Sequence, residues 1–210
     1  MIILPIVEGH GEVEAVPILL RRIAETFLSG VYLDIRKPIR IPRSKLVKAD
    51  ELARAVTLAV RKMQGAGDGR GAVLVLLDGD GEAPCILGPR LLAVAHEHHP
   101  DADVVAVVAH LEYETWFVAA AGSLVEHGKL VLQEGETLPE DPEGRSLRKA
   151  WVDRHMRDRR SRYSETIDQP RFTNCMDLVA CRSRSPSFDK LCRELEKRCA
   201  RAGDVPDGPG

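Results

Sequence analysis

The stretch IILPIVEGHGEVEAV, residues 2–16, decides how this chain folds. Its first six residues are apolar without alternation, which predicts a short strand of a parallel sheet that is covered on both faces. The chain then passes through a glycine-containing turn between two carboxylates, Glu8 and Glu12. A strand that ends in this way is an unusual connection. The first question is therefore whether these carboxylates hold a metal ion or only form a loop.

A helix is expected to follow this turn. Residues 14–28 repeat apolar side chains at helical spacing. Pro17 is compatible with such a helix only if the helix begins near Val13 or Glu14, where the missing N–H of proline is not needed. The acidic segment before the helix is therefore expected in the strand-to-helix turn.

Strands and helices continue to alternate along the chain. Further patterns predict strands at residues 32–41, 72–77 and 103–109, and helices at residues 48–63 and 86–99. Pro38 weakens the strand at 32–41 because proline lacks the N–H that a sheet ladder needs. Asp50 is the expected N-terminal cap of the helix at 48–63. The alternation predicts an α/β fold with an open, mostly parallel sheet that is flanked by helices.

The composition is that of an ordinary globular chain. Of 210 residues, 44% are apolar and 30% are charged, and the net charge is −2, so the whole molecule is not a strong polycation. Five cysteines without a CxxC pair argue against a disulfide framework or a zinc site, and they fit a reduced, cytoplasmic protein. No segment approaches 18 apolar residues, so no membrane span is predicted.

The character of the sequence changes near residue 134. We expect a catalytic core in residues 1–133, a basic helical and irregular extension packed on it in residues 134–202, and a flexible tail in residues 203–210. The extension contains a group of arginines that predict contacts with nucleic-acid phosphates, namely Arg154, Arg157, Arg159, Arg160 and Arg162. A solvated face, or a surface that docks an acidic partner, is the alternative interpretation.

A second polar cluster lies further along the extension. Arg182 and Arg184 are candidates for additional contacts with nucleic acid. Lys190 is a candidate catalytic residue, because its ammonium group would stabilise transition-state charge if this segment returned to the edge of the sheet.

Three of the predicted strands are each followed by a pair of carboxylates. The pairs are Glu8 with Glu12, Asp78 with Asp80, and Glu112 with Glu114. In an open parallel sheet, residues that follow the strands meet at the carboxyl edge, where ligands bind. Carboxylates at one place repel each other unless a cation joins them, and oxygen ligands suit Mg²⁺ or Mn²⁺. Together these acids predict a metal site, although each motif alone is more typical of a turn or a helix cap.

Two pairs of motifs carry a resemblance to known proteins. VEGHGE (residues 7–12) followed by LLDGDG (76–81) resembles the Toprim fold, the catalytic domain of topoisomerases, primases and overcoming-lysogenization-defect (OLD) nucleases. HLEYETWFVA (110–119) and RSPSFDKL (184–191) resemble a narrower set, the small bacterial Toprim-like proteins of domain-of-unknown-function family 4276. Those proteins are often encoded beside an ATPase and are suspected of roles in phage defence.

The resemblance implies a Mg²⁺ site formed by the same acids. Glu8 would be a metal ligand or the general base, and the two aspartates of LLDGDG would be metal ligands. Glu12 matches the second acid of OLD-like nucleases, and Glu112 and Glu114 match the family's acidic helix start without an assigned role. The pair His10-Gly11 stands where many relatives carry a different pair of small residues. His10 has two interpretations, proton transfer or a cap or surface role, of which the second is favoured.

Three functions follow from these observations. The first is a Mg²⁺-dependent nuclease, with DNA favoured over RNA as its substrate and an ABC- or AAA-type ATPase as the expected partner in antiphage defence. The second is a phosphohydrolase for small substrates, which would share the metal site but would not need the arginines. The third is a non-catalytic subunit that regulates or binds an ATPase complex, against which the intact acids count. Homo-oligomerisation is compatible with all three.

Overall fold

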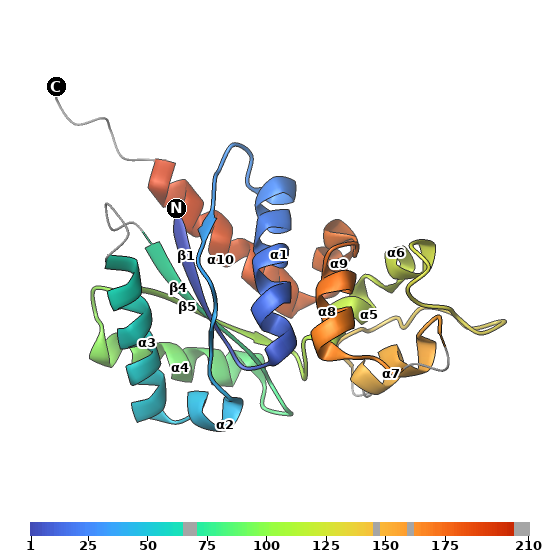
Figure 1. Cartoon of the computed structure of the whole chain (residues 1–210), viewed down its shortest axis with the longest axis horizontal. Coiled ribbons are helices and arrows are strands. Elements are labelled where there is room, and N and C mark those ends of the chain that lie inside the picture. Colours follow the sequence, from blue (N-terminus) through green and yellow to red (C-terminus); the bar gives the residue numbers. More distant parts are fainter. Residues whose placement is uncertain (65–70, 145–147, 159–161, 204–210) are drawn as a thin grey trace.

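The computed structural model describes residues 1–64, 71–144, 148–158 and 162–203 and shows one open parallel sheet between layers of helices (Figure 1). The strand order is β2-β1-β4-β5, and β3 also pairs with β1. All the pairings are parallel. The strands are β1 (Ile2–Val7), β2 (Asp34–Ile35), β3 (Ile39–Arg40), β4 (Gly71–Asp78) and β5 (Asp103–Ala109). The predicted α/β fold with an open parallel sheet flanked by helices is confirmed.

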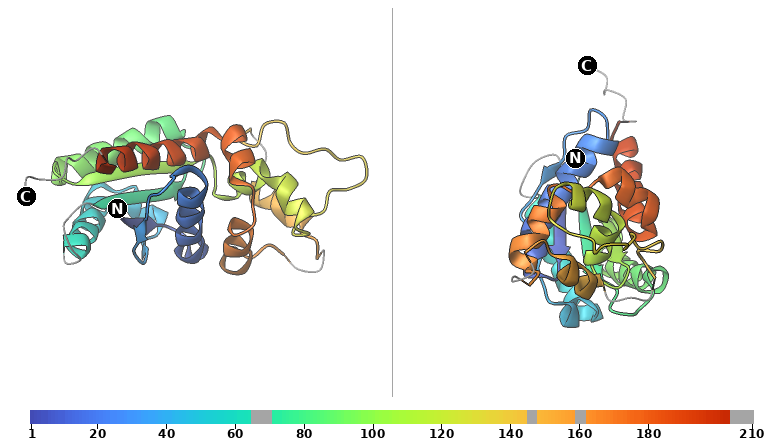
Figure 2. Two further views of the ribbon diagram at one scale, coloured as in Figure 1. Left: turned by 90° about the horizontal axis from the view of Figure 1, so that it is seen from above. Right: turned by 90° about the vertical axis from the view of Figure 1, so that its right-hand side faces the viewer.

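The helices cover both faces of this sheet and extend past one end of it. α1 and α10 lie over one face and α3 and α4 over the other, while α5 to α9 gather beside the N-terminal end of α1 (Figures 1 and 2). The helices are α1 (His10–Phe27), α2 (Arg43–Leu46), α3 (Ala49–Gln64), α4 (Pro84–His98), α5 (Glu114–Ala119), α6 (Ala121–Glu126), α7 (Arg148–His155), α8 (Glu165–Thr173), α9 (Leu178–Arg184) and α10 (Pro186–Gly203). No helix in the described ranges is long and apolar enough to cross a lipid bilayer.

Two hydrophobic cores lie on the two faces of the sheet. Ile3 and Leu74 belong to the core shared with α1 and α10, and their neighbours Leu4 and Val73 belong to the core shared with α3 and α4. Successive side chains of a strand point to opposite faces, so a strand between two layers must be apolar at every position. This explains why the runs at the two central strands show no polar alternation.

The start of α1 differs from the prediction. The helix begins at His10 rather than near Val13, and Pro17 therefore lies inside it. Glu12 is thus in the first helical turn and not in the connecting loop. A proline within a helix removes the hydrogen bond to the carbonyl four residues earlier, and its ring crowds that carbonyl. The interactions of Glu12 with the backbone before the helix stabilise the earlier start in spite of this cost.

Two further boundaries were predicted only in part. The strand expected at 32–41 is divided into β2 and β3, which pair with the beginning and the end of β1. Pro38 lies between the two pieces, as expected from its missing ladder donor. α3 begins at Ala49, so Asp50 lies within the first turn of the helix and is not its cap, which corrects the prediction.

The C-terminal segments complete the layer that α1 begins. α8 packs along α1, and α10 packs along β5. Phe172 of α8 and Leu191 of α10 belong to the same buried cluster as Leu19 of α1. The residues after 134 therefore share one core with the residues before it.

Candidate metal centre

Three carboxylates meet at the carboxyl ends of β1 and β4. Glu8 directly follows β1, Glu12 lies in the first turn of α1, and Asp78 is the last residue of β4. Each offers an oxygen atom within 4.8 Å of the oxygen atoms offered by the other two. The two strands are neighbours in the sheet, so their carboxyl ends place the three acids together. We call Glu8, Glu12 and Asp78 the acidic triad.

Glu12 organises the backbone around the triad. Its side chain is buried, with 2% exposure of the residue. Its Oε2 atom accepts hydrogen bonds from the backbone N–H groups of Glu8 and Gly9, each at 2.9 Å. This contact caps α1 and holds the turn that carries Glu8. Burial raises the pKa of Glu12 to about 8, and the charges of Glu8 and Glu114 add to the rise.

Glu8 and Asp78 each present a carboxylate oxygen that lacks a partner. Glu8 Oε1 accepts a hydrogen bond from the Asp78 backbone N–H at 3.2 Å. Glu8 Oε2 and Asp78 Oδ1 are buried and have no hydrogen-bond partner in the described part of the chain. Burial is the main cause that raises the pKa of both groups, followed by the charge of Asp80 for Glu8 and that of Glu12 for Asp78.

A second wall faces the triad from α5 and α8. Glu114 and Gln169 are each 3% exposed, and Glu114 Oε1 and Gln169 Oε1 are buried without a partner among the described residues. Burial, followed by the charge of Glu112, raises the pKa of Glu114 to about 7. A Cβ atom at Gly11 would overlap the Gln169 side chain, so this glycine allows α1 and α8 to approach closely.

The two walls enclose one cavity, which we call the acidic cavity. Its volume is about 250 Å³, and its polar lining consists of Glu8, Glu12, Asp78, Asp80, Glu114, Arg43, Glu165 and Gln169. Six of these side chains are carboxylates, and all of them except Glu165 come from strand ends or from the turns and helices that follow the strands. The arrangement agrees with the rule that an open parallel sheet presents its ligand site beyond the carboxyl ends of its strands.

The structure separates the two aspartates of the DGDG turn. Asp78 belongs to the acidic triad, whereas Asp80 lies at the cavity mouth with its side chain 62% exposed. The Asp80 carboxylate pairs with Arg43, with 3.3 Å between Oδ2 and Nε. Asp80 has a φ of 47°, a left-handed conformation that is uncommon for residues other than glycine.

Glu112 lies outside the acidic cavity. Its Oε1 atom accepts the backbone N–H of Lys149, and it lines an adjacent cavity of about 480 Å³ together with Lys149 and Arg162. The Lys149 ammonium group pairs with Glu165, which raises the pKa of Lys149. The structure therefore brings Glu114 to the triad but places Glu112 beside a cation.

Arg43, Gln169 and Lys149 were not predicted to belong to the site. Gln169 reaches the acidic cavity because α8 packs against α1. Lys149 lines the adjacent cavity and pairs with Glu165 of α8. No local motif marks either residue. Arg43 carried one signal, since it follows the strand predicted at 32–41 and strand ends are where ligands bind. His10 begins α1 with an exposed side chain, a place that agrees with the favoured surface interpretation and leaves its role a prediction.

The predicted arginines divide into two groups. Arg154, Arg157 and Arg162 are exposed, while Arg159 and Arg160 lie outside the described residues. Arg182 and Arg184 have partners within the chain. Arg182 bonds to the carboxylates of Asp189 and Glu196.

Arg184 also forms hydrogen bonds within the chain, in its case to backbone carbonyls. Its guanidinium group donates to the Ala119 carbonyl at 2.9 Å and to the Pro139 carbonyl. These bonds join α9 to α5 and to the loop before α7. The geometry therefore assigns Arg182 and Arg184 to the scaffold and not to a free phosphate-binding surface.

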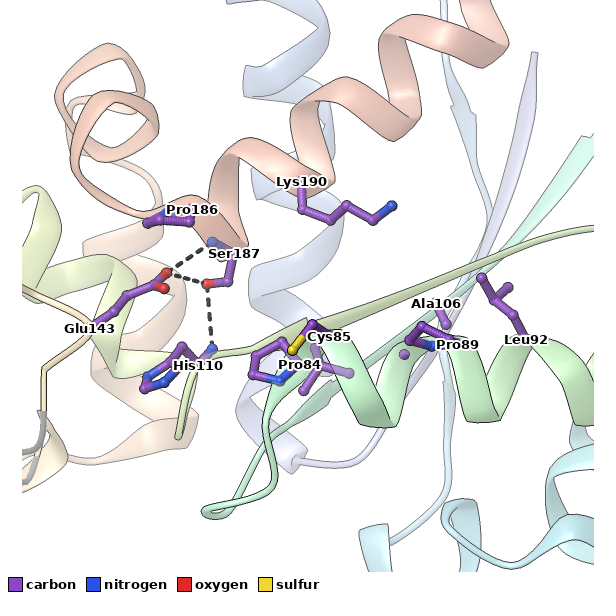
Figure 3. Close-up of a pocket in the computed structure, with 12 residues that line it drawn as sticks. Pro84, Cys85, Pro89, Leu92, Ala106, His110, Glu143, Pro186, Ser187 and Lys190 are labelled. Carbon is purple, nitrogen blue, oxygen red and sulfur yellow. Dashed lines mark hydrogen bonds between the residues drawn. The ribbon is translucent and has the colours of Figure 1, made fainter.

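Lys190 is also separated from the triad. It lines a cavity of about 460 Å³ between α4 and α10, and none of the residues that line this cavity line the acidic cavity (Figure 3). Its Nζ atom pairs with Glu194 at 2.6 Å, one helical turn along α10. The predicted catalytic role required Lys190 to reach the acids at the sheet edge, and the position of α10 along β5 prevents this.

The donors of the acidic cavity fit a hard divalent cation. The groups that face it are carboxylate and amide oxygens, the ligands that Mg²⁺ and Mn²⁺ prefer. Buried polar atoms are costly when they lack partners, and within the described ranges Glu8 Oε2, Asp78 Oδ1 and Glu114 Oε1 are such atoms. A bound cation would satisfy them and remove the repulsion that raises their pKa values.

A comparison of the chain with known families gives one result. Residues 7–196 match the model of the family described as a domain of unknown function (DUF4276), and the chain therefore belongs to this family. The predicted membership of family 4276 is thus confirmed. No curated protein and no solved structure matches the chain.

Proposed function

We propose that this protein is a divalent-cation-dependent phosphodiesterase of the Toprim type that cleaves nucleic acid. One observation carries the proposal: carboxylates from the ends of two adjacent parallel strands and from the following helix meet within 4.8 Å. Two of them present buried oxygens that have no partner among the residues that the structure describes. The order of the motifs VEGHGE and LLDGDG, which resembles the Toprim fold, supports the same reading.

The residues of the cavity have distinct roles in this proposal. Glu8 and Asp78 would hold the cation, and Glu114, which faces them across the cavity, would be a further ligand. A bound Mg²⁺ or Mn²⁺ would supply Lewis-acid stabilisation of a phosphoryl oxygen and a water of lowered pKa. Glu12 positions Glu8 through its two backbone hydrogen bonds.

Cations near the cavity provide the means to bind a phosphate. Lys149 and Arg162 line the adjacent cavity, and Arg154 and Arg157 are exposed on and just after α7. Positive side chains around an acidic centre are needed to hold a polyanion. These residues support nucleic acid as the substrate, with DNA favoured over RNA on the resemblance alone.

The test is a cleavage assay on plasmid DNA, single-stranded DNA and RNA, with Mg²⁺, with Mn²⁺ and with chelator. The wild type is compared with Glu8→Gln and Asp78→Asn, and with Asp101→Asn as a control for the loss of a carboxylate at an exposed position away from the cavity. We expect metal-dependent cleavage that both cavity variants abolish and the control retains. Cleavage that survives in both cavity variants would contradict the proposal.

The size of the acidic cavity favours one alternative function. A volume of about 250 Å³ would suit a phosphate monoester or a nucleotide as well as one phosphate of a polymer. Hydrolysis of p-nitrophenyl phosphate or nucleotides, with no cleavage of any polymer, would identify a small-substrate phosphohydrolase.

The proposal extends to a partner and a biological role. The resemblance to proteins encoded beside an ATPase supports an ABC- or AAA-type ATPase partner in antiphage defence. If purified protein binds metal but cleaves nothing, the assay should be repeated with the product of an adjacent ATPase gene and ATP. Activity that appears only then identifies a partner-dependent nuclease, and continued inactivity of the complex favours a non-catalytic subunit.

A further inference from the structure

Arg43 links the acidic cavity to the turn that carries Asp80. It is the first residue of α2 and follows β3, which pairs with the end of β1. The backbone N–H of Ile41 donates to the Val7 carbonyl at 2.8 Å. This pairing carries the chain past the end of β1 and places Arg43 beside the end of β4.

The guanidinium group of Arg43 contacts the DGDG turn through two hydrogen bonds and one ion pair. Its Nε atom donates to the Asp78 carbonyl at 3.0 Å, and its Nη2 atom donates to the Gly79 carbonyl at 2.9 Å. The same Nε atom lies 3.3 Å from Asp80 Oδ2. The Arg43 side chain is only 24% exposed and lines the acidic cavity. One arginine therefore contacts both the backbone that presents Asp78 and the carboxylate of Asp80.

The position of Asp80 has a consequence for the cation. Asp80 is not part of the triad whose oxygens lie within 4.8 Å of each other, and its carboxylate faces Arg43 instead. Its backbone is held on the other side, since the Asp80 N–H donates to the Leu111 carbonyl at 2.9 Å. With the backbone held at both sides, the side chain is the part of Asp80 that is free to change partner.

We propose that Arg43 and the divalent cation compete for the Asp80 carboxylate, and that the guanidinium group, which loses this ion pair but keeps its bonds to the Asp78 and Gly79 carbonyls, then binds the phosphate of the substrate. The inference rests on the proposed function and names the group that couples cation binding to substrate binding. Arg43 is thus a positioning residue for the DGDG turn without the cation and a substrate-binding residue with it.

The competition predicts effects of opposite sign on two ligands. Arg43→Gln removes a positive charge that competes for an exposed carboxylate, so Mg²⁺ should bind about two- to fivefold more tightly, the scale of a surface ion pair. The same variant lacks a charged donor for the phosphate, so an oligonucleotide should bind about tenfold more weakly when a divalent cation is present. If Arg43 only held the turn in place, Arg43→Gln would weaken the binding of both ligands.

The experiment measures each ligand separately on the full-length protein. Mg²⁺ affinity is measured by calorimetry, and the affinity for a fluorescent 20-nucleotide single strand is measured by anisotropy with and without Ca²⁺, at constant ionic strength. The variants are Arg43→Gln, Arg43→Lys, Asp80→Asn and the double variant of Arg43→Gln with Asp80→Asn. Arg54→Gln is the control for loss of one charge, because Arg54 lies on α3 with its side chain 70% exposed.

Coupling through Asp80 gives the decisive comparison. We expect Arg43→Gln to tighten Mg²⁺ binding in the wild-type background but not in the Asp80→Asn background, and Arg43→Lys to keep Mg²⁺ affinity near that of the wild type. Weaker binding of both ligands in Arg43→Gln, or an unchanged Mg²⁺ affinity, would overturn the inference. Tighter Mg²⁺ binding with unchanged oligonucleotide binding would overturn the claim that Arg43 binds the substrate phosphate.

The outcomes also separate this inference from the proposed function. A wild type that binds no divalent cation overturns both. A wild type that cleaves no nucleic acid, combined with tighter Mg²⁺ binding in Arg43→Gln that depends on Asp80, overturns the nuclease and retains the competition. Normal metal-dependent cleavage with no change in Mg²⁺ affinity in Arg43→Gln retains the nuclease and overturns the competition.

Discussion

Glu143 and Glu8 are carboxylates on the walls of two different cavities, and their surroundings are opposite. Glu143 Oε1 accepts hydrogen bonds from the Ser187 N–H at 2.9 Å and the Ser187 hydroxyl at 2.7 Å (Figure 3). It also accepts one from the Ser185 hydroxyl at 2.5 Å. Glu8 Oε2 and Asp78 Oδ1 are buried without a partner in the described ranges. The cavity between α4 and α10 satisfies its carboxylate within the chain, whereas in the acidic cavity these two oxygens have no donor among the described residues.

This difference indicates which carboxylates stabilise the fold and which await a ligand. A carboxylate that accepts several bonds at the start of a helix contributes to folding. Carboxylates that repel each other and lack donors cost stability until a cation arrives. Charge and burial alone would not separate the two cavities, because both contain acids at least partly shielded from solvent.

The largest expected effect is on activity in the acidic cavity. Asp78→Asn should lower metal-dependent cleavage about a thousandfold or more, because a catalytic cation supplies several kcal/mol of transition-state stabilisation. The metal-free variant should unfold at the same temperature as the wild type or higher, because one repelling charge is gone. Initial rates and melting curves in chelator check the two parts, and a large loss of metal-free stability would show that Asp78 is structural.

A smaller effect is expected on the packing that forms the wall of this cavity. Gly11→Ala should lower the free energy of unfolding by about 1–3 kcal/mol, the usual cost of overpacking, because the added methyl group meets α8. The matched control is Gly122→Ala in α6, where the nearest atom to a new Cβ is Leu138 Cδ1 at 3.5 Å. Urea unfolding should show no loss for the control, and equal effects of the two substitutions would contradict the close approach of α1 and α8.

The opposite response is expected at the satisfied carboxylate. Glu143→Gln should lower the free energy of unfolding by about 1 kcal/mol, because neutral hydrogen bonds replace charge-assisted ones. The melting temperature should fall by about 2–4 °C, with no change in metal-dependent cleavage. If this variant were as inactive as Asp78→Asn, the distinction between the two cavities would fail.

The pKa values predict how stability depends on pH. The folded-state pKa values of Glu12 and Glu114 are raised to about 8 and about 7, so the folded protein retains protons that the unfolded chain has released. Metal-free stability should therefore fall between pH 6 and pH 8. Because Mg²⁺ must displace these protons, its stabilising effect should be larger at pH 8, by a few degrees in melting temperature.

Melting curves at both pH values, with Mg²⁺ and with chelator, check this expectation. Glu12→Gln is the control, because the amide oxygen can still accept the two backbone N–H groups but carries no proton to release. In this variant, metal-free stability should decrease much less between pH 6 and pH 8 than it does in the wild type. A wild type whose melting temperature in chelator rises from pH 6 to pH 8 would show that the acids are not held in their protonated form.

The smallest expected effect is on the salt dependence of nucleic-acid binding. Arg162→Gln should reduce the slope of log affinity against log salt by about 1 if its guanidinium group neutralises one phosphate. Arg184→Gln should leave the slope unchanged and lower stability instead, because Arg184 bonds to the Ala119 and Pro139 carbonyls. A reduced slope for Arg184→Gln would reverse this assignment.

Local patterns predicted the sheet and the acids that follow its strands. The runs at 2–7, 72–77 and 103–109 are apolar at every position because both faces of these strands are covered, and this property is visible in any window of the sequence. The turn chemistry was also local, since Pro38 interrupts the edge strand where expected. The start of α1 was misjudged because Pro17 was given more weight than the cap formed by Glu12.

The composition of the site depended on distant segments. Nothing in the sequence around Asp80 shows that it faces Arg43 and not Asp78, because this contact requires β3 to pair with β1. Gln169 likewise reaches the cavity only through the packing of α8 on α1. Lys190 was expected near the acids because the polar cluster that contains it could return to the edge of the sheet, but the path of α10 along β5 carries it to another cavity.

Periodicity and strand-end chemistry are local properties, and from them the amino-acid sequence alone established an α/β sheet with acids at one edge and membership of one family. Only the tertiary structure decided which of those acids share a cavity. It also decided which arginines are exposed and which are bonded within the scaffold. The physical reason is that a hydrogen bond or an ion pair depends on distances between segments far apart in the chain, and these distances exist only after the layers have packed.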